Sequence, residues 1–256
     1  MRDSTGLTID EITRYWLLTS AIEFSRGLAY FLPKVHELGL NMKEIPGCAP
    51  EGYAATLLDL FDAGELEFSS ALEDDDVTSR AGVSNILDRF LGYSRVHPED
   101  RLIRAISEIP SFGPNRVPQN LKVKFKLTEL GGEAWERVAE PDWFHFFGQS
   151  NDNETGELYS QDLTLLMARL GWFDELASAR VAIDTIQLQM HSDYQVLYWK
   201  RLPSVYRATF SVSDCDSRWV PTNFEPRWFR EWWHSTTRWH KQPWNLPGWP
   251  NEPPRK

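Results

Sequence analysis

The feature that most constrains the fold of this chain is residues 122–138, where a strand pattern runs directly into a helix pattern. Val123, Phe125 and Leu127 alternate with three lysines, which predicts a strand with one apolar face and one charged face. Thr128 then stands where a helix cap is expected, and two glycines and an apolar helical stripe follow it. These residues therefore predict a strand, a tight turn and a helix in immediate succession.

An upstream segment, residues 53–68, has the converse order of a helix followed by a strand. Apolar residues recur at helical spacing from Ala54 to Phe61, behind a Pro-Glu pair that can begin a helix. Gly64 ends this pattern, and the four residues after it alternate acidic and apolar side chains. That alternation is typical of a half-buried strand.

Together these two segments resemble the core of a winged-helix domain. The pattern Leu-Thr-Glu-x-Gly-Gly-Glu at 127–133 resembles the turn between wing and helix in many bacterial winged-helix proteins. The resemblance covers roughly residues 8–70 and 120–140, and it implies a fold rather than an activity. It also implies that the helix at about 50–63 occupies the position that normally enters the DNA major groove.

The segment before this core predicts a long, buried helix. Thr8 and Glu11 have the spacing of a capping box, and apolar residues continue from Ile12 to Leu28. We expect the helix to end at about Leu32, because Pro33 cannot donate an intrahelical hydrogen bond.

Residues 73–120 are expected to be a helical insertion between the winged-helix strands. Two helices are predicted within it, at 84–91 and 98–109, and the prolines that follow indicate an extended connection. The first domain is accordingly assigned to residues 1–148.

Residues 149–256 are expected to form a second, small α+β domain, which makes the whole chain α+β. The polar, turn-rich segment 149–157 is the predicted boundary. Ser160 is expected to cap a helix that Gly171 ends. Three strand patterns then follow at 181–190, 194–199 and 205–212, with short polar connections that favour an antiparallel meander.

The C-terminal tail is rich in tryptophan and predicts an amphipathic helix at about 225–241. Its aromatic side chains fall on one helical face and its charged side chains on the other; the aromatic members are Trp228, Phe229, Trp232, Trp233 and Trp239. The aromatic face is expected to cover the meander sheet. A partner-binding surface and an interfacial membrane helix are the alternatives.

Charge is distributed unevenly along the chain. The formal net charge is −10, yet residues 217–256 carry seven Lys or Arg against three Glu, a local charge of +4 that leaves −14 on residues 1–216. Residues 44–79 contain no Lys or Arg at all. Since DNA affinity depends on cations that neutralise phosphates, a recognition helix in this acidic stretch is expected to repel a duplex.

The acidic stretch is therefore the predicted surface for a basic protein partner. The candidate partner-binding residues are Glu51, Asp59, Asp62, Glu65, Glu67, Asp74, Asp75 and Asp76. If the chain binds nucleic acid instead, the candidates are Lys122, Lys124 and Lys126 on the predicted wing. The alternatives for those lysines are an ordinary solvent-facing side of the strand or the protection of an edge strand.

No motif for catalysis, a metal or a cofactor stands out in the sequence. Cys48 and Cys215 lie far apart, no two histidines have metal-ligand spacing, and neither a phosphate loop nor a nucleophile elbow is present. For an enzyme we would consider first His191, Asp193 and Tyr194, although a turn between two strands explains them better. No catalytic residue, metal site or cofactor is therefore predicted.

These observations favour a non-enzymatic, acidic, cytoplasmic protein that binds a basic protein partner. Bacterial immunity proteins, which neutralise toxins, are similar in charge and in the lack of catalytic motifs. The alternative is a winged-helix DNA-binding regulator, and the third hypothesis is an enzyme of unrecognised type. The cytoplasmic location is expected because the N-terminus lacks a secretory pattern and no apolar run of about 18 residues occurs.

Overall fold

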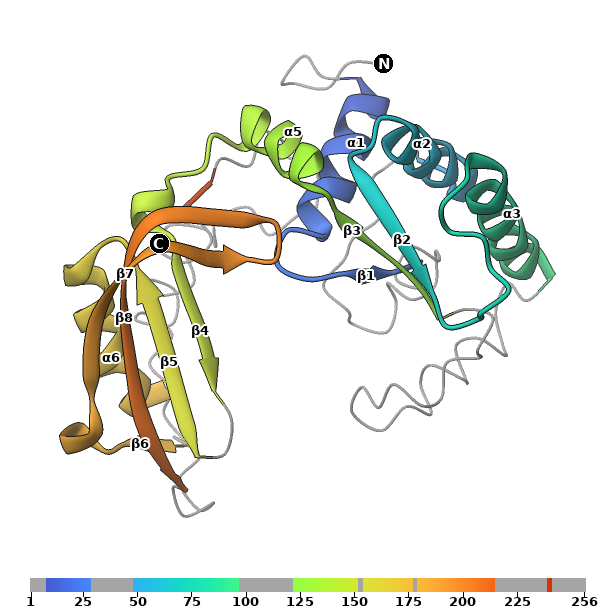
Figure 1. Ribbon diagram of the computed structural model, residues 1–256. Coiled ribbons are helices and arrows are strands. Elements are labelled where there is room, and N and C mark those ends of the chain that lie inside the picture. The colour runs from blue at the N-terminus through green and yellow to red at the C-terminus, as the bar shows by residue number, and fades with distance from the viewer. Residues whose placement is uncertain are drawn as a thin grey trace, which may run out of the picture. The chain divides into compact units, whose positions relative to one another are not determined.

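The fold was analysed in a computed structural model that describes residues 8–28, 48–96, 122–151, 154–176, 179–214 and 239–240. The described residues divide into two compact units between Val138 and Ala139, here called unit 1 and unit 2. Both units combine helices with a small antiparallel sheet, which confirms the α+β class (Figure 1). None of the described helices is long and apolar enough to span a membrane.

Unit 1 contains a three-stranded antiparallel sheet in the order β1-β3-β2. Its elements are α1 (Ile9–Ser20), β1 (Arg26–Gly27), α2 (Pro50–Asp62), β2 (Leu66–Ser70), α3 (Arg80–Val96), β3 (Val123–Leu127) and α5 (Glu129–Ala139). Helix α2 packs against α1, α3 and β2 (Figure 1). The second helix expected in the insertion, at 98–109, lies outside the described residues.

Helix α1 begins as predicted and ends earlier than predicted. Thr8 accepts a hydrogen bond from the Glu11 amide, and the Glu11 carboxylate accepts one from the Thr8 amide at 2.7 Å, which completes the capping box. The helix ends at Ser20, whose carbonyl accepts a hydrogen bond from the Arg26 side chain as the chain turns into β1. Ala21, Ile22 and Phe24 therefore lie outside the helix, and Phe24 is 49% exposed. The predicted end of the helix at Leu32 lies outside the described residues.

The α2–β2 connection agrees with the sequence pattern. Pro50 lies at the start of α2, where its missing amide hydrogen costs nothing. After the helix Gly64 adopts a φ of 70°, a left-handed conformation that a residue with a Cβ rarely adopts. In β2 the side chains of Leu66 and Phe68 are buried and that of Glu67 is exposed.

The β3–α5 connection was also predicted correctly. Val123, Phe125 and Leu127 are buried, while Thr128 accepts a hydrogen bond from the Gly131 amide at 3.1 Å and caps α5. A Cβ at Gly131 would lie 2.0 Å from the Glu65 carbonyl oxygen, so glycine lets the first turn of α5 approach β2.

The core of unit 1 lies between its helices and the inner face of the sheet. Its largest fully buried side chains are Trp16, Trp135, Phe125, Leu17, Leu28, Leu57, Leu60, Leu66 and Leu127. The Trp135 indole donates a hydrogen bond to Thr19 at 3.2 Å, so its polar atom is satisfied inside the core.

Unit 2 contains a larger antiparallel sheet in the order β4-β5-β8-β6, with β7 also paired to β8. Its elements are β4 (Phe147–Asn151), β5 (Thr155–Ser160), α6 (Leu163–Leu176), β6 (Ala179–Val181), β7 (Gln187–Leu197), β8 (Lys200–Asp214) and the short 3-10 helices η5 (Trp143–His145) and η6 (Ile183–Thr185). The polar segment 149–157, expected to be a domain boundary, instead contributes to β4 and β5. Its turn residues join two strands of one hairpin, with Asn151 opposite Gly156.

Two further expectations for this half are corrected by the structure. Asp162, not Ser160, caps α6 by accepting a hydrogen bond from the Thr164 amide at 2.8 Å, and the helix continues past Gly171 to Leu176. In addition, the strands predicted at 181–190 and 194–199 are not two separate strands of that length. The structure has a short β6 and one long β7 there. The hairpin turn lies between Leu197 and Lys200, and the hairpin bends away from the sheet toward that turn (Figure 1).

Each face of the unit 2 sheet has its own apolar cluster. On one face α6 covers a core that consists of Leu158, Leu166, Leu170, Val181, Ala208 and Phe210. A second, aromatic cluster contains Trp143, Phe146 and Trp239, with the Phe146 and Trp239 rings 4.8 Å apart. Trp239 is thus buried within unit 2, whereas the rest of the predicted helix at 225–241, apart from His240, lies outside the described residues.

Candidate functional site

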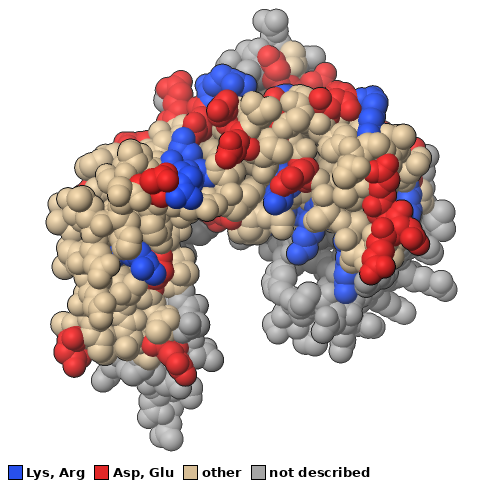
Figure 2. Space-filling model, in the orientation of Figure 1, with Lys and Arg blue, Asp and Glu red and all other residues tan. Residues whose placement is uncertain are grey.

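The exposed side of α2 carries acidic side chains at the positions that the sequence predicted. Glu51, Asp59 and Asp62 are exposed there and are here called the α2 acidic stripe, with Ala55 between the first two. The opposite side of the helix is buried through residues such as Leu57. Figure 2 shows Asp and Glu side chains over α2 and over the turn between β2 and α3.

Several of the predicted acidic residues are held by cations of unit 1. The ion pairs are Arg14–Glu65, Arg80–Asp62, Arg89–Asp75 and Lys126–Glu67. These four cations come from α1, α3 and β3, outside the segment 44–79 that the sequence showed to be free of Lys and Arg. The fold therefore neutralises part of a charge that looks continuous in the sequence.

Glu65 is buried, although the alternation after Gly64 placed it on the solvent face of the strand. It is 8% exposed and lies at the tight turn before β2, where its amide donates to the Leu60 carbonyl at 2.9 Å. Its own carbonyl accepts from the Thr128 amide at 3.0 Å, and its carboxylate faces Arg14. Glu65 thus holds α1, β2 and α5 together and is not available to a partner.

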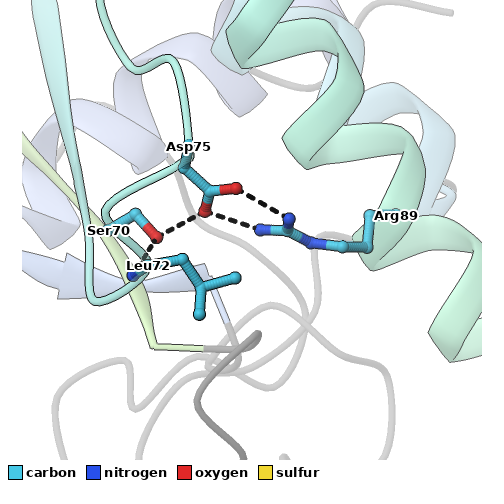
Figure 3. Close-up of polar contacts among 4 residues, drawn as sticks. All are labelled: Ser70, Leu72, Asp75 and Arg89. Atoms are coloured by element: carbon cyan, nitrogen blue, oxygen red, sulfur yellow. Dashed lines mark hydrogen bonds and ion pairs between the residues drawn. The ribbon is translucent and has the colours of Figure 1, made fainter.

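Asp75 and Asp76 organise the turn before α3. The Arg89 guanidinium donates two hydrogen bonds of 2.8 Å to the Asp75 carboxylate, which also accepts one from the Ser70 hydroxyl (Figure 3). These bonds hold the pKa of Asp75 below its ordinary value. Asp76 accepts hydrogen bonds from Ser79 and Thr78, which lower its pKa to about 2.

The exposed acidic surface is therefore smaller than predicted. Glu51 and Asp59 lie on the α2 acidic stripe, and Asp74 is exposed in the turn before α3. Asp62 and Glu67 are also at the surface, each beside a cation. Asp59 lies between Glu51 and Asp62 along α2 and is exposed.

The three candidate lysines share the outer face of the unit 1 sheet, which we call the lysine face. Lys124 and Lys126 are exposed and Lys122 is half-buried. Strand β3 is the central strand of its sheet, so the protection of an edge strand does not explain these lysines. Lys126 lies opposite Glu67 in the register and pairs with it at 2.7 Å, which reduces the positive charge of this face.

Unit 2 contains a polar cluster that the sequence identified only in part. The Tyr194 hydroxyl donates to one Glu157 oxygen at 2.5 Å, and Arg207 donates to the other at 2.7 Å. The His191 ring lies 5.7 Å from the Tyr194 ring. His191 and Tyr194 were considered from sequence, whereas Glu157 and Arg207 come from other strands, and no local pattern indicates that they would meet.

A turn was expected around Asp193, but this residue lies within strand β7. Asp193 has a φ of 52° between residues that pair with Ser204 and Leu202, opposite a proline that has no amide hydrogen to donate. Its carboxylate accepts a hydrogen bond from Arg201 at 2.8 Å. Asp193 therefore belongs to the geometry of the hairpin rather than to the polar cluster.

The polar cluster of unit 2 contains an ion pair between Glu157 and Arg207. The Arg207 hydrogen bond, and to a lesser extent that of Tyr194, hold the pKa of Glu157 below its ordinary value. Burial, followed by the hydrogen bond to Glu157, raises the pKa of the Tyr194 hydroxyl. Both Glu157 oxygens are thus engaged with groups of the same sheet.

Among the described residues no group of three or more His, Cys, Asp or Glu side chains could hold a metal ion. Burial also raises the pKa of the Cys48 thiol, which disfavours its thiolate form at neutral pH. Cys215, the other cysteine, lies outside the described residues.

Comparison with protein-family models, with curated proteins and with solved structures finds no match to this chain. The charge and geometry of its own residues are therefore the basis for a functional proposal. Unit 1 has two surfaces of marked charge, the α2 acidic stripe and the lysine face.

Proposed function

We propose that this chain is a non-enzymatic binding protein that binds a basic protein partner through the α2 acidic stripe. The observation that carries the proposal is that the exposed side of α2 has carboxylates and no cation of its own. Lys and Arg side chains of a partner would find complementary charge there, which speeds association and selects against acidic partners. The likeness in charge to bacterial immunity proteins supports the same class of function.

We also propose that unit 1 has a winged-helix-like arrangement. The sheet order β1-β3-β2, with β1 between α1 and α2 in sequence, supports it. In such an arrangement α2 occupies the place of a DNA-recognition helix, yet its acidic side chains would repel phosphates. The fold would then present to a protein the helix that related folds present to DNA.

A DNA-binding regulator is the second candidate, and the exposed Lys124 and Lys126 favour it. These lysines are two neighbouring cations on one face, and one of them already pairs with Glu67. Binding to phosphates through this face would weaken steeply with added salt. An enzyme of unrecognised type and a cytoplasmic location both stay predictions from the sequence.

The test is affinity capture from a lysate of the source cells treated with nuclease, with the wild-type chain and an E51K/D59K variant. Both substitutions lie at exposed positions, so the helix is expected to fold. The wild-type chain should retain a basic protein after nuclease treatment, and the variant should lose it. The control is D184K, which reverses a single charge at an exposed position in η6 of unit 2.

The outcomes separate the two candidates. Retention of the partner by D184K and its loss from E51K/D59K would support the acidic stripe as the binding surface. Equal capture by all three proteins would contradict it. Nucleic acid that binds the wild-type chain, and disappears together with its proteins after nuclease, would favour the regulator.

A further inference from the structure

Strand β7 forms an edge of the unit 2 sheet, and its first half is open to solvent on both faces. Among the described strands β7 pairs only with β8, and its residues Gln187 to Met190 are all exposed. Backbone amide and carbonyl groups along such an edge can pair with a further strand. The first half of β7, residues 187–192, is here called the β7 edge.

The β7 edge has exposed apolar side chains, whereas sheet edges usually carry charged residues or proline that prevent pairing with another chain. Leu188 is 44% exposed and Met190 is 70% exposed. They lie opposite Ala208 and Tyr206 in the register, so they extend the sheet face that α6 covers. Ile183, in the 3-10 helix before β7, is 78% exposed and enlarges the apolar surface near this edge.

The other edge of the sheet is different. Strand β4 is shorter, and the exposed side chains described on it are those of Gln149 and Ser150. A long, exposed and apolar edge favours strand pairing with another chain, whereas a short polar edge does not. The comparison singles out the β7 edge within unit 2.

Charge indicates which partner fits this edge. Residues 185–192 contain no Asp, Glu, Lys or Arg, although the chain has a net charge of −10. The next acid, Asp193, is held by Arg201 at 2.8 Å. A second copy of the chain carries the same net charge, so two copies can approach each other most closely at a neutral segment.

The sequence of the edge is also complementary to itself. We propose that the β7 edge pairs with the β7 edge of a second copy, antiparallel about a two-fold axis at Gln189. Gln189 of one copy then lies opposite Gln189 of the other. In the same way Leu188 lies opposite Met190, and Gln187 lies opposite His191, across the two copies. Apolar side chains meet on one face and polar ones on the other, as a self-complementary interface requires. The pairing joins two sheets across copies and does not depend on the α2 acidic stripe.

Sedimentation velocity over a range of concentrations tests the pairing. The average mass of the wild-type chain should rise from 29.7 kDa toward twice that value as concentration increases. An L188K/M190K variant should remain at the monomer mass, because four lysines would meet across the axis. The matched control is L130K/V138K, which places two lysines at exposed apolar positions of α5 in unit 1 and should behave like the wild-type chain. Circular dichroism and thermal unfolding of each variant confirm that it is folded.

A cysteine cross-link tests the register itself. Residues directly opposite in an antiparallel pair have Cα atoms about 4.5 to 5.5 Å apart, which a disulfide can span. Under mild oxidation Q189C should form a covalent dimer, while Q149C on β4 should not. A wild-type chain that stays monomeric at every concentration would overturn the proposal. So would a dimer that persists in L188K/M190K, since another surface would then hold it.

Discussion

Arg89 holds the Asp75 carboxylate with two hydrogen bonds of 2.8 Å and thereby ties the turn before α3 to the body of that helix (Figure 3). The Asp75 side chain is 9% exposed and that of Arg89 is 33% exposed, so water screens the pair only in part. The sequence had suggested Asp75 as a partner-binding residue. In the fold it is a structural residue.

Replacement of Asp75 by alanine should lower the free energy of unfolding by about 2 kcal/mol, because Arg89 would remain partly buried without its carboxylate. Urea denaturation followed by tryptophan fluorescence measures the change. The control is D74A in the neighbouring exposed position, where a change below about 0.5 kcal/mol is expected. Equal losses for the two variants would contradict the assigned role of Asp75.

The same ion pair predicts a dependence on pH. The Arg89 hydrogen bonds keep the folded-state pKa of Asp75 below its ordinary value of 3.8, so the stabilisation is fully present above that value. It is lost as the pH falls through the folded-state pKa. The difference in unfolding free energy between the wild-type chain and D75A should therefore be constant at neutral pH and should narrow below about pH 4. If this difference in unfolding free energy grew on acidification, the assigned role of the Asp75–Arg89 pair would be contradicted.

The two glycines Gly131 and Gly92 should respond in opposite ways to alanine. G131A should destabilise unit 1 by about 3 kcal/mol, since a Cβ there would lie 2.0 Å from the Glu65 carbonyl oxygen and α5 would have to move. Gly92 lies in α3 with nothing within 4 Å of an added Cβ. G92A should therefore stabilise the helix by about 0.5 to 1 kcal/mol. Thermal unfolding of both variants provides the measurement, and a stable G131A would refute the close approach of α5 to β2.

Local patterns predicted the parts of the fold that depend on nearest neighbours in sequence. The capping box at Thr8, the end of α2 before Gly64 and the alternation along β3 are all confirmed, since each depends on a few consecutive residues. Glu51, Asp59 and Asp62, the partner-binding candidates on α2, are exposed on one side of the helix, as the apolar spacing of the other side implies.

Other features depend on contacts between distant segments, and the sequence could not predict them. Glu65 is buried because Arg14, some fifty residues away in sequence, lies beside it. The polar cluster of unit 2 forms because β8 places Arg207 next to Glu157 of β5. Helix α1 ends at Ser20 because the chain turns to pair β1 with β3, which lies about a hundred residues further on. The spacing of apolar residues does not predict the pairing of β1 with β3.

The dissociation constant of the purified partner, measured at low and at high salt, decides whether the α2 acidic stripe binds a basic protein. For D59K at low salt we predict an affinity about tenfold weaker than that of the wild-type chain, equivalent to about 1.4 kcal/mol. The difference should shrink as salt screens the charges, and D184K should bind like the wild-type chain. Equal dissociation constants for D59K and the wild-type chain at every salt concentration would contradict the claim.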